Sequence, residues 1–183
     1  FSNDECEFGY RDSIFKKKLK GKFIILSACF SLQKFPHSID ISYGAINSQL
    51  ADKLATIQNI AEAVIAIRLS KLPNPKKIGN SGSFFKNPIV TLNDFKKIQK
   101  IFPKLPHYPS KEGFVKISAG WIIESLGFKG IREGDAGVHE KQALVLVNYG
   151  TASGIQILAL AKKIQKAALD KFGVSLETEV NIL

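Results

Sequence analysis

Three short segments carry residues whose types could do chemistry, and the first is GNSGSFFKNP at residues 79–88. Gly79 and Gly82 permit a tight loop with exposed amide hydrogens, and such amides bind phosphate and other anions. The loop could therefore hold a phosphate or present the hydroxyl of Ser83. It has neither the GxxxxGK[ST] spacing of a P-loop nor the GxGxxG spacing of a dinucleotide-binding turn. A simple turn containing a serine is the alternative reading of this stretch.

The second segment, FGYRDSIF at residues 8–15, places Arg11 and Asp12 among aromatic residues. A guanidinium can form two parallel hydrogen bonds to one carboxylate, which makes Arg11 a candidate for binding an acidic substrate group. Pairing of Arg11 with Asp12, or with another acid on the surface, would explain the same residues without any substrate.

The third segment is LETEV at residues 176–180. Glu177 and Glu179 alternate in what we expect to be a terminal strand, so their carboxyl groups face the same side. Both carboxyl groups are candidates for a site, and a solvated strand edge is the alternative.

The charge of the chain indicates an anionic partner. Twenty-six basic residues against sixteen acidic ones give a net charge of +10, and residues 71–117 hold ten lysines against Asp94 and Glu112. Nucleic acid, a membrane surface and a small phosphorylated ligand all suit this charge, and so does a solvated lysine-rich surface.

The composition argues against several classes of protein. No apolar run reaches the roughly 20 residues of a membrane span, and residues 23–32, interrupted by two serines, are expected to form a buried strand. The polar, acidic residues 1–13 lack the features of a secretory signal, so we expect a cytoplasmic protein. Cys6 and Cys29 are predicted to be free thiols, and the three scattered histidines predict no metal site.

Apolar periodicity and capping residues predict four helices. These are residues 56–72, with Thr56 as a possible N-cap and Pro73 as terminator; 92–102, ending before Pro103; 119–126, capped by Gly127; and a long helix that starts at Ser153 and stops at Gly173.

Shorter apolar runs predict strands or extended pieces. Residues 143–148 are nearly all apolar, which indicates a strand covered on both faces. Strands and helices follow one another without an internal repeat, which is typical of an α+β or α/β fold. The other predicted strands or extended pieces are 22–35, 39–43, 84–90, 114–118 and 174–180, and residues 79–83 are predicted to be a loop.

Taken together and in order, the motifs resemble the UDP-N-acetylenolpyruvoylglucosamine reductases, flavoenzymes of bacterial cell-wall precursor synthesis. The resemblance covers almost the whole chain, and GNSGSFFKNP is its most specific part. The matching segments are FGYRDSIFK from residue 8, YG at 43–44, residues 71–88, FVKISAGWIIE from 114, VHEKQALVLVN from 138, and LETEV.

The resemblance implies an α+β fold, with the carboxy-terminal part of an FAD-binding domain followed by a compact α+β substrate-binding domain. It implies a bound FAD that NADPH reduces, and hydride transfer to the outer carbon of an enolpyruvyl ether. Ser83 would be the general acid that protonates the adjacent carbon. Arg11 and Glu179 would hold the substrate carboxyl group and stabilise the enolic species, for which Glu179 must be protonated or hydrogen-bonded.

The implied substrate is UDP-N-acetylglucosamine enolpyruvate. Tyr43 resembles the tyrosine of a loop that folds over the nucleotide sugar in one variant of this family. Lys71, Asn87 and Gln142 match positions that contact the diphosphate or the sugar, which would give the lysine excess a role in neutralising UDP.

The sequence departs from the family's pattern in two places. The glycine-rich FAD-binding segment has no counterpart before Phe1, so we expect that an amino-terminal portion is missing and that the fragment alone is inactive. Near the other end, Thr178 stands where proline is common and Asn181 where a basic residue can occur.

These expectations define three regions and two competing functions. Residues 1–72 would complete the FAD-binding domain, 73–173 would form the substrate-binding domain, and 174–183 would be a return strand carrying Glu179. A noncatalytic UDP-sugar-binding module is the first alternative. A basic nucleic-acid-binding domain is the second and weaker one, because aromatic residues do not interleave with the lysines. We therefore expect no nucleic-acid or membrane partner.

Overall fold

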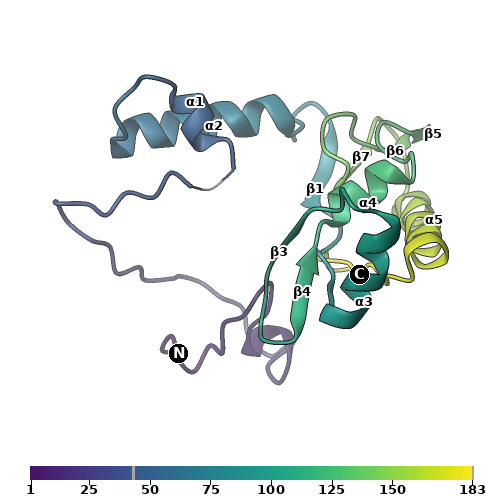
Figure 1. Cartoon of the computed structure of the whole chain (residues 1–183), viewed down its shortest axis with the longest axis horizontal. Helices are drawn as coiled ribbons and strands as arrows, with labels where there is room; N and C mark the ends of the chain where they lie inside the picture. The colour runs from purple at the N-terminus through teal and green to yellow at the C-terminus, as the bar shows by residue number, and fades with distance from the viewer. Residues whose placement is uncertain (43, 183) are drawn as a thin grey trace. The chain divides into compact units, whose positions relative to one another are not determined.

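The computed structural model describes residues 1–42 and 44–182 (Figure 1). The chain divides into two compact units, residues 1–60 and 61–183, and the division falls inside helix α2 (Ile57–Lys71). Each unit is therefore described by itself.

The first unit contains little regular secondary structure. Its described elements are a 3-10 helix, η1 (Ile14–Lys16), and the short helix α1 (Ile46–Leu50). A tight turn closes between Gly9 and Asp12, where each backbone amide donates to the other residue's carbonyl oxygen. Its buried side chains include Cys6, Ser13, Ile46 and Leu50.

The prediction of a buried strand at residues 23–32 is wrong. These residues form no strand, and Ile24 and Leu26 are 87% and 92% exposed. A strand requires a hydrogen-bonding neighbour, and no strand in the described part of the chain pairs with this segment. The apolar composition of residues 23–32 is therefore not sufficient to bury them.

The four predicted helices are confirmed, and their caps explain where they begin and end. Thr56 Oγ1 accepts from the Asn59 amide (3.1 Å) at the start of α2. Ser153 and Gln156 form a reciprocal capping box at the start of α5, and Gly173 ends that helix in the left-handed conformation. The other helices are α3 (Leu92–Ile101) and α4 (Ala119–Ser125), and α5 is Gly154–Phe172.

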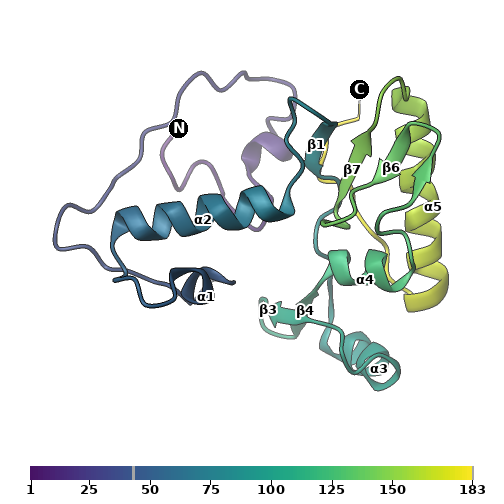
Figure 2. The same ribbon diagram turned by 90° about the horizontal axis from the view of Figure 1, so that it is seen from above.

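The larger sheet of the second unit has the strand order β1-β7-β6-β5, and all neighbouring strands are antiparallel. Helix α5 packs against β6 and β7 (Figure 2). The predicted strand around residues 143–148 is confirmed as β7, and its residues 145–147 are buried on both faces. The strands are β1 (Gly79–Ser83), β5 (Arg132–Glu133), β6 (Ala136–Val138) and β7 (Val145–Asn148).

The smaller sheet has the order β2-β4-β3 and is also antiparallel, with α3 beside it. Its central strand was predicted, whereas β3 falls in a stretch whose prolines indicate a loop. Proline is tolerated there because β3 is an edge strand, where an amide need not pair. The strands are β2 (Ile89–Thr91), β3 (His107–Pro109) and β4 (Phe114–Ile117).

Two further predictions at the ends of the larger sheet need correction. Residues 79–83, predicted to be a loop, form the edge strand β1. Residues 174–180, predicted to be a strand, form only an isolated antiparallel bridge between Thr178 and Phe85. The segment after α5 nevertheless returns toward β1, as Figure 2 shows.

A single hydrophobic core joins both sheets and helices α3 to α5 of the second unit, which confirms the predicted α+β class. Its fully buried side chains include Phe85, Ile117, Ile164 and Leu176. No helix among the described residues has the length and apolar character needed to cross a membrane.

Candidate active site

Ser83 is the last residue of β1 and pairs with Val145 of β7. The register between β1 and β7 shifts between Asn80 and Ser83, and Gly82 within this irregularity has a φ of +75°. Only glycine adopts that conformation without strain. The Asn80 side chain accepts from the Gly82 amide (3.1 Å), which fixes the bulge just before the half-buried Ser83.

The backbone after Ser83 connects the sheet to the segment that carries Glu179. The Phe84 amide donates to the Leu144 carbonyl oxygen (2.7 Å), and the Phe84 carbonyl oxygen accepts from the Glu179 amide (2.8 Å). The Lys86 amide donates to the Glu177 carbonyl oxygen (2.9 Å). The structure therefore brings the backbone segments of Ser83 and Glu179 together, although 96 positions separate them in the sequence.

Asn87 and Gln142 both reach the first turn of α4. Asn87 Oδ1 accepts from the Ala119 amide (3.0 Å). A Cβ atom on Gly120 would lie 3.8 Å from Gln142 Oε1, so that side chain also borders the turn. Gln142 Oε1 accepts from the Leu144 amide (3.5 Å) as well. Two residues predicted to bind substrate thus have their oxygens engaged by the protein, and their amide nitrogens are the groups left to act as donors.

Two further predicted site residues, Lys71 and Arg11, are both exposed. Lys71 is the exposed last residue of α2. Arg11 belongs to the first unit, where it is exposed, has a φ of +54° and lies with its guanidinium carbon 5.9 Å from the Tyr10 ring centroid. Tyr43 lies outside the described residues.

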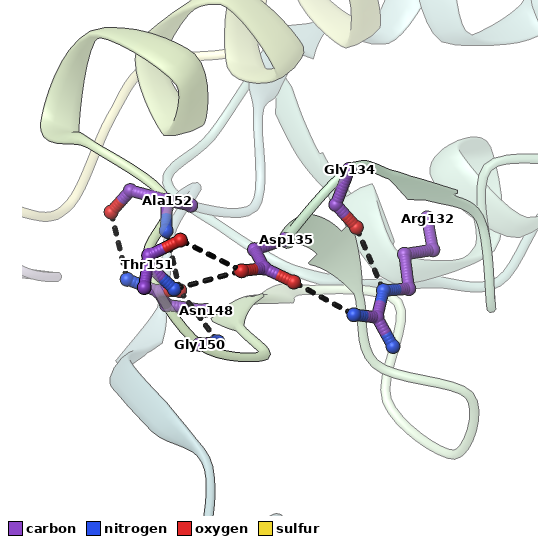
Figure 3. A network of polar contacts seen from close by, with 7 residues as sticks. All are labelled: Arg132, Gly134, Asp135, Asn148, Gly150, Thr151 and Ala152. Carbon is purple, nitrogen blue, oxygen red and sulfur yellow. Dashed lines mark hydrogen bonds and ion pairs between the residues drawn. The ribbon is translucent and has the colours of Figure 1, made fainter.

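A polar network that sequence reasoning missed ties β5 to the turn after β7 (Figure 3). Asp135 accepts from the Thr151 amide (2.8 Å), the Thr151 hydroxyl (3.0 Å) and Arg132 (2.7 Å). These hydrogen bonds, that of the Thr151 amide first, hold the pKa of the Asp135 carboxyl group below its usual range. The Arg132 guanidinium also lies 4.5 Å from the Tyr149 ring centroid. The network fixes the loop from which α5 begins.

His139 is a buried histidine that directly follows β6 and precedes the turn at Gln142. It is 7% exposed, and its amide donates to the Val145 carbonyl oxygen (2.9 Å). Burial lowers the pKa of its imidazole, because the charged form loses hydration there. Burial therefore favours the neutral form of His139 in the folded protein. Among the described residues, no group of three or more histidine, cysteine, aspartate or glutamate side chains could hold a metal ion.

A hollow of about 520 Å³ lies in the first unit, and none of its lining residues is a predicted site residue. Its walls come from two segments and are mainly apolar, with no lysine or arginine among them. The lining residues are Phe35, Pro36, His37, Ile39 and residues 55–58.

Comparison with known proteins identifies the family of the second unit. Residues 74–183 match the model of the UDP-N-acetylenolpyruvoylglucosamine reductase C-terminal domain. The whole chain is 53% identical to the UDP-N-acetylenolpyruvoylglucosamine reductase of Flavobacterium johnsoniae, of which it covers 55%. It is 49% identical to that of Pseudomonas putida, of which it covers 54%.

A solved structure, that of UDP-N-acetylenolpyruvylglucosamine reductase from Thermus caldophilus, also matches part of the chain. The match has 26% identity and a TM-score of 0.42, and it covers 68% of this chain and 33% of that one.

The second unit is thus an α+β domain in which a serine segment and a glutamate segment adjoin. The chain belongs to the UDP-N-acetylenolpyruvoylglucosamine reductase family, and the sequence resemblance is confirmed. It spans about half the length of the curated relatives that it matches.

Proposed function

We propose that this chain supplies substrate-binding and catalytic residues to a cytoplasmic oxidoreductase that reduces UDP-N-acetylglucosamine enolpyruvate to UDP-N-acetylmuramate in peptidoglycan precursor synthesis. The observation that carries the proposal is the backbone pairing of residues 84–86 with 177–179, in a domain of this family. That pairing holds a hydroxyl-bearing and a carboxyl-bearing segment side by side. Residues 1–72 then serve the flavin domain, residues 73–173 bind the substrate, and 174–183 return Glu179 to Ser83.

FAD and NADPH are the cofactors of this proposal. The hollow of the first unit offers mainly apolar walls and no cation for a diphosphate. When bound by the full-length protein, FAD supplies the hydride, and NADPH restores the reduced flavin. The contribution of this chain is therefore to bind the substrate and to deliver a proton.

Ser83 is the proposed proton donor. When a hydride adds to the outer carbon of the enolpyruvyl double bond, the electron pair of that bond moves to the adjacent carbon and its carboxylate. The Ser83 hydroxyl gives its proton to that adjacent carbon, which completes the lactyl ether, and it recovers a proton from solvent. In support, Ser83 is half-buried, and its hydroxyl forms no hydrogen bond with any residue that the structure describes.

Arg11 and Glu179 are proposed to stabilise the charge that develops on the substrate carboxyl group. The Arg11 guanidinium can bind that group through two parallel hydrogen bonds. Glu179 is half-buried, and a protonated carboxyl group there would donate a hydrogen bond to the enolic oxygen. A bare carboxylate would repel the same oxygen, so this role requires a Glu179 carboxyl group that is protonated or hydrogen-bonded.

The nucleotide sugar is proposed to lie against the first turn of α4. The oxygens of Asn87 and Gln142 already accept hydrogen bonds from the protein, so their NH₂ groups would donate to the sugar or diphosphate. Lys71 would add positive charge for the diphosphate, and Tyr43 would cover the ligand. In each of these two side chains, the oxygen is bonded to the protein and the nitrogen would donate to the ligand. An anionic ligand with many acceptor oxygens would accept both hydrogen bonds.

The decisive experiment separates the two half-reactions of the full-length protein. Ser83→Ala should leave flavin reduction by NADPH unchanged, and should slow reoxidation by the enolpyruvyl sugar by about 10²- to 10⁴-fold, the usual contribution of a general acid. Ser81→Ala is the matched control, since Ser81 is an exposed serine of the same strand. Reoxidation at the parent rate in Ser83→Ala would show that Ser83 is not the proton donor.

Flavin absorption and ligand binding test the competing functions. A full-length protein without a flavin absorption band that still bound the UDP-sugar would be a noncatalytic binding module. We expect a flavin band and little DNA binding at physiological salt. Tight, salt-sensitive DNA binding would instead favour the nucleic-acid reading of the net charge of +10.

A further inference from the structure

The segment that carries Glu179 follows α5 and is not a regular strand. After Gly173 the chain reverses direction, residues 174–177 alternate between buried and exposed positions, and residues 178–180 are half-buried. Val174 and Leu176 enter the core with exposed fractions of 2% and 1%. Among the residues that the structure describes, only the Thr178 to Phe85 bridge connects this segment to a neighbour in the manner of a strand. The backbone before that bridge must therefore find other partners.

Gln165 of α5 provides one such partner. Its side-chain nitrogen Nε2 donates to the carbonyl oxygen of Leu176 at 2.7 Å, in a half-buried position. The Leu176 side chain is fixed in the core, so its carbonyl lies where a hydrogen bond lost to the protein is poorly replaced by water. The contact joins the longest helix of the second unit to the residue three positions before Glu179.

The Gln165 contact and the bridge hold opposite ends of the same short stretch. Gln165 fixes the Leu176 carbonyl, and the next two hydrogen bonds fix the Glu177 carbonyl and the Glu179 amide. Another side-chain contact here is the ion pair of Lys86 with Glu177 (3.3 Å), in which Glu177 is 74% exposed. Exposed ion pairs contribute little because solvent screens them. Gln165 thus adds a side-chain hydrogen bond from α5 to a segment that the buried Val174 and Leu176 side chains also hold.

We propose that Gln165 is a positioning residue for the reaction, setting the register of residues 176–179 and so the place of the Glu179 carboxyl group beside Ser83. This inference rests on the proposed function. A carboxyl group that acts through one hydrogen bond is sensitive to displacement, because catalytic geometry tolerates errors of only about 0.5 Å. Removing the Gln165 donor therefore affects the transfer step more than it affects substrate binding.

The test uses the full-length protein and rapid-mixing measurement of both half-reactions. Gln165→Met has nearly the same shape but no donor, and it should slow reoxidation by the enolpyruvyl sugar at saturating substrate by about tenfold, which is about 1.4 kcal/mol. Substrate affinity and flavin reduction by NADPH should stay at parent values. Gln165→Arg restores an N–H donor and should recover most of the rate. Lys162→Met, an exposed change on the same helix, is the matched control.

A double-mutant cycle distinguishes positioning from general stabilisation. In a Glu179→Gln background, Gln165→Met should cause little further slowing, because the group it positions is already altered. Equal slowing in both backgrounds would overturn the inference, and so would a parent rate in Gln165→Met alone. If Gln165→Met fails to fold, Gln165→Glu replaces it, since it keeps the shape and a polar group while losing the amide donor, and it should be similarly slow at neutral pH.

The outcome is separable from that of the proposed function. If Ser83→Ala and Glu179→Gln leave reoxidation unchanged, the proposed function itself fails. If those two variants are slow and Gln165→Met is not, only the role of Gln165 fails.

Discussion

The backbone amide of Glu179 donates a 2.8 Å hydrogen bond to the carbonyl oxygen of Phe84, the residue that directly follows Ser83. Phe84 also donates through its own amide to Leu144 of the larger sheet. One residue therefore connects the sheet to the returning carboxy-terminal segment. The backbone positions of Glu179 and of the residue next to Ser83 are therefore coupled by a direct hydrogen bond.

Proline should be tolerated at position 178 but not at position 179. The bridge uses the Glu177 carbonyl and the Glu179 amide, whereas the Thr178 amide forms no hydrogen bond with any described residue. Thr178→Pro should therefore keep the free energy of unfolding within about 1 kcal/mol of the parent. Urea unfolding of the chain measures this.

The matched pair Glu179→Pro and Glu179→Ala isolates the amide at the next position. Both variants lose the carboxyl group, but only proline removes the donor to Phe84. Glu179→Pro should be less stable than Glu179→Ala by about 1–3 kcal/mol, the cost of an unsatisfied buried group. Equal stabilities would mean that the Phe84 bond contributes nothing.

His139 should make the second unit less stable as the pH falls. The unfolded chain takes up a proton on this imidazole near about pH 6.5, whereas the buried imidazole resists protonation until a lower pH. The unfolded state then binds more protons, so the stability that is present above about pH 6.5 is lost as the pH falls through the folded-state pKa. His139→Gln should flatten this dependence between about pH 7 and pH 5 in urea unfolding. His37→Gln, at an exposed histidine, should leave it unchanged.

Asp135 should contribute stability that disappears in acid. Hydrogen bonds from Thr151 and Arg132 lower its carboxyl pKa in the folded state, so the unfolded chain is protonated first as the pH falls. The contribution is present above about pH 3.9 and is lost below it, as the pH falls through the folded-state pKa. Asp135→Asn should lower the midpoint temperature at neutral pH and show a weaker loss in acid, measured by circular dichroism. Asp52→Asn, at an exposed aspartate, should behave like the parent.

A methyl group should be damaging at Gly137 and harmless at Gly154. A Cβ atom on Gly137 would lie 2.7 Å from a ring carbon of Tyr149 and 2.9 Å from the Ile131 carbonyl oxygen, which is backbone and cannot rotate away. Gly137→Ala should cost about 1–3 kcal/mol in unfolding free energy. Gly154, the first residue of α5, has open space around it, and Gly154→Ala should be neutral or stabilising by up to about 1 kcal/mol. Urea unfolding of both variants gives the comparison, and a neutral Gly137→Ala would contradict the packing described.

The sequence by itself determined the helices and the family of this protein. Helices form hydrogen bonds within one segment, so local signals such as Thr56, the Ser153 capping box and Gly173 were enough to place their ends. The GNSGSFFKNP motif was equally local, and it identified the family before any contact was known. The order of the helices and strands left an α+β or α/β fold open, and the family resemblance implied the α+β class.

Only the tertiary structure decided which extended segments pair and that the backbone segments of Ser83 and Glu179 adjoin. A strand depends on a neighbour that is distant in sequence, which is why residues 79–83 became a strand while residues 23–32 did not. The same dependence on distant backbone partners brings Glu179 to Phe84 and joins Gln165 to Leu176. The residue pattern around Glu179 or around Gln165 does not encode these two contacts. Both contacts depend on how segments that are distant in the sequence pack together.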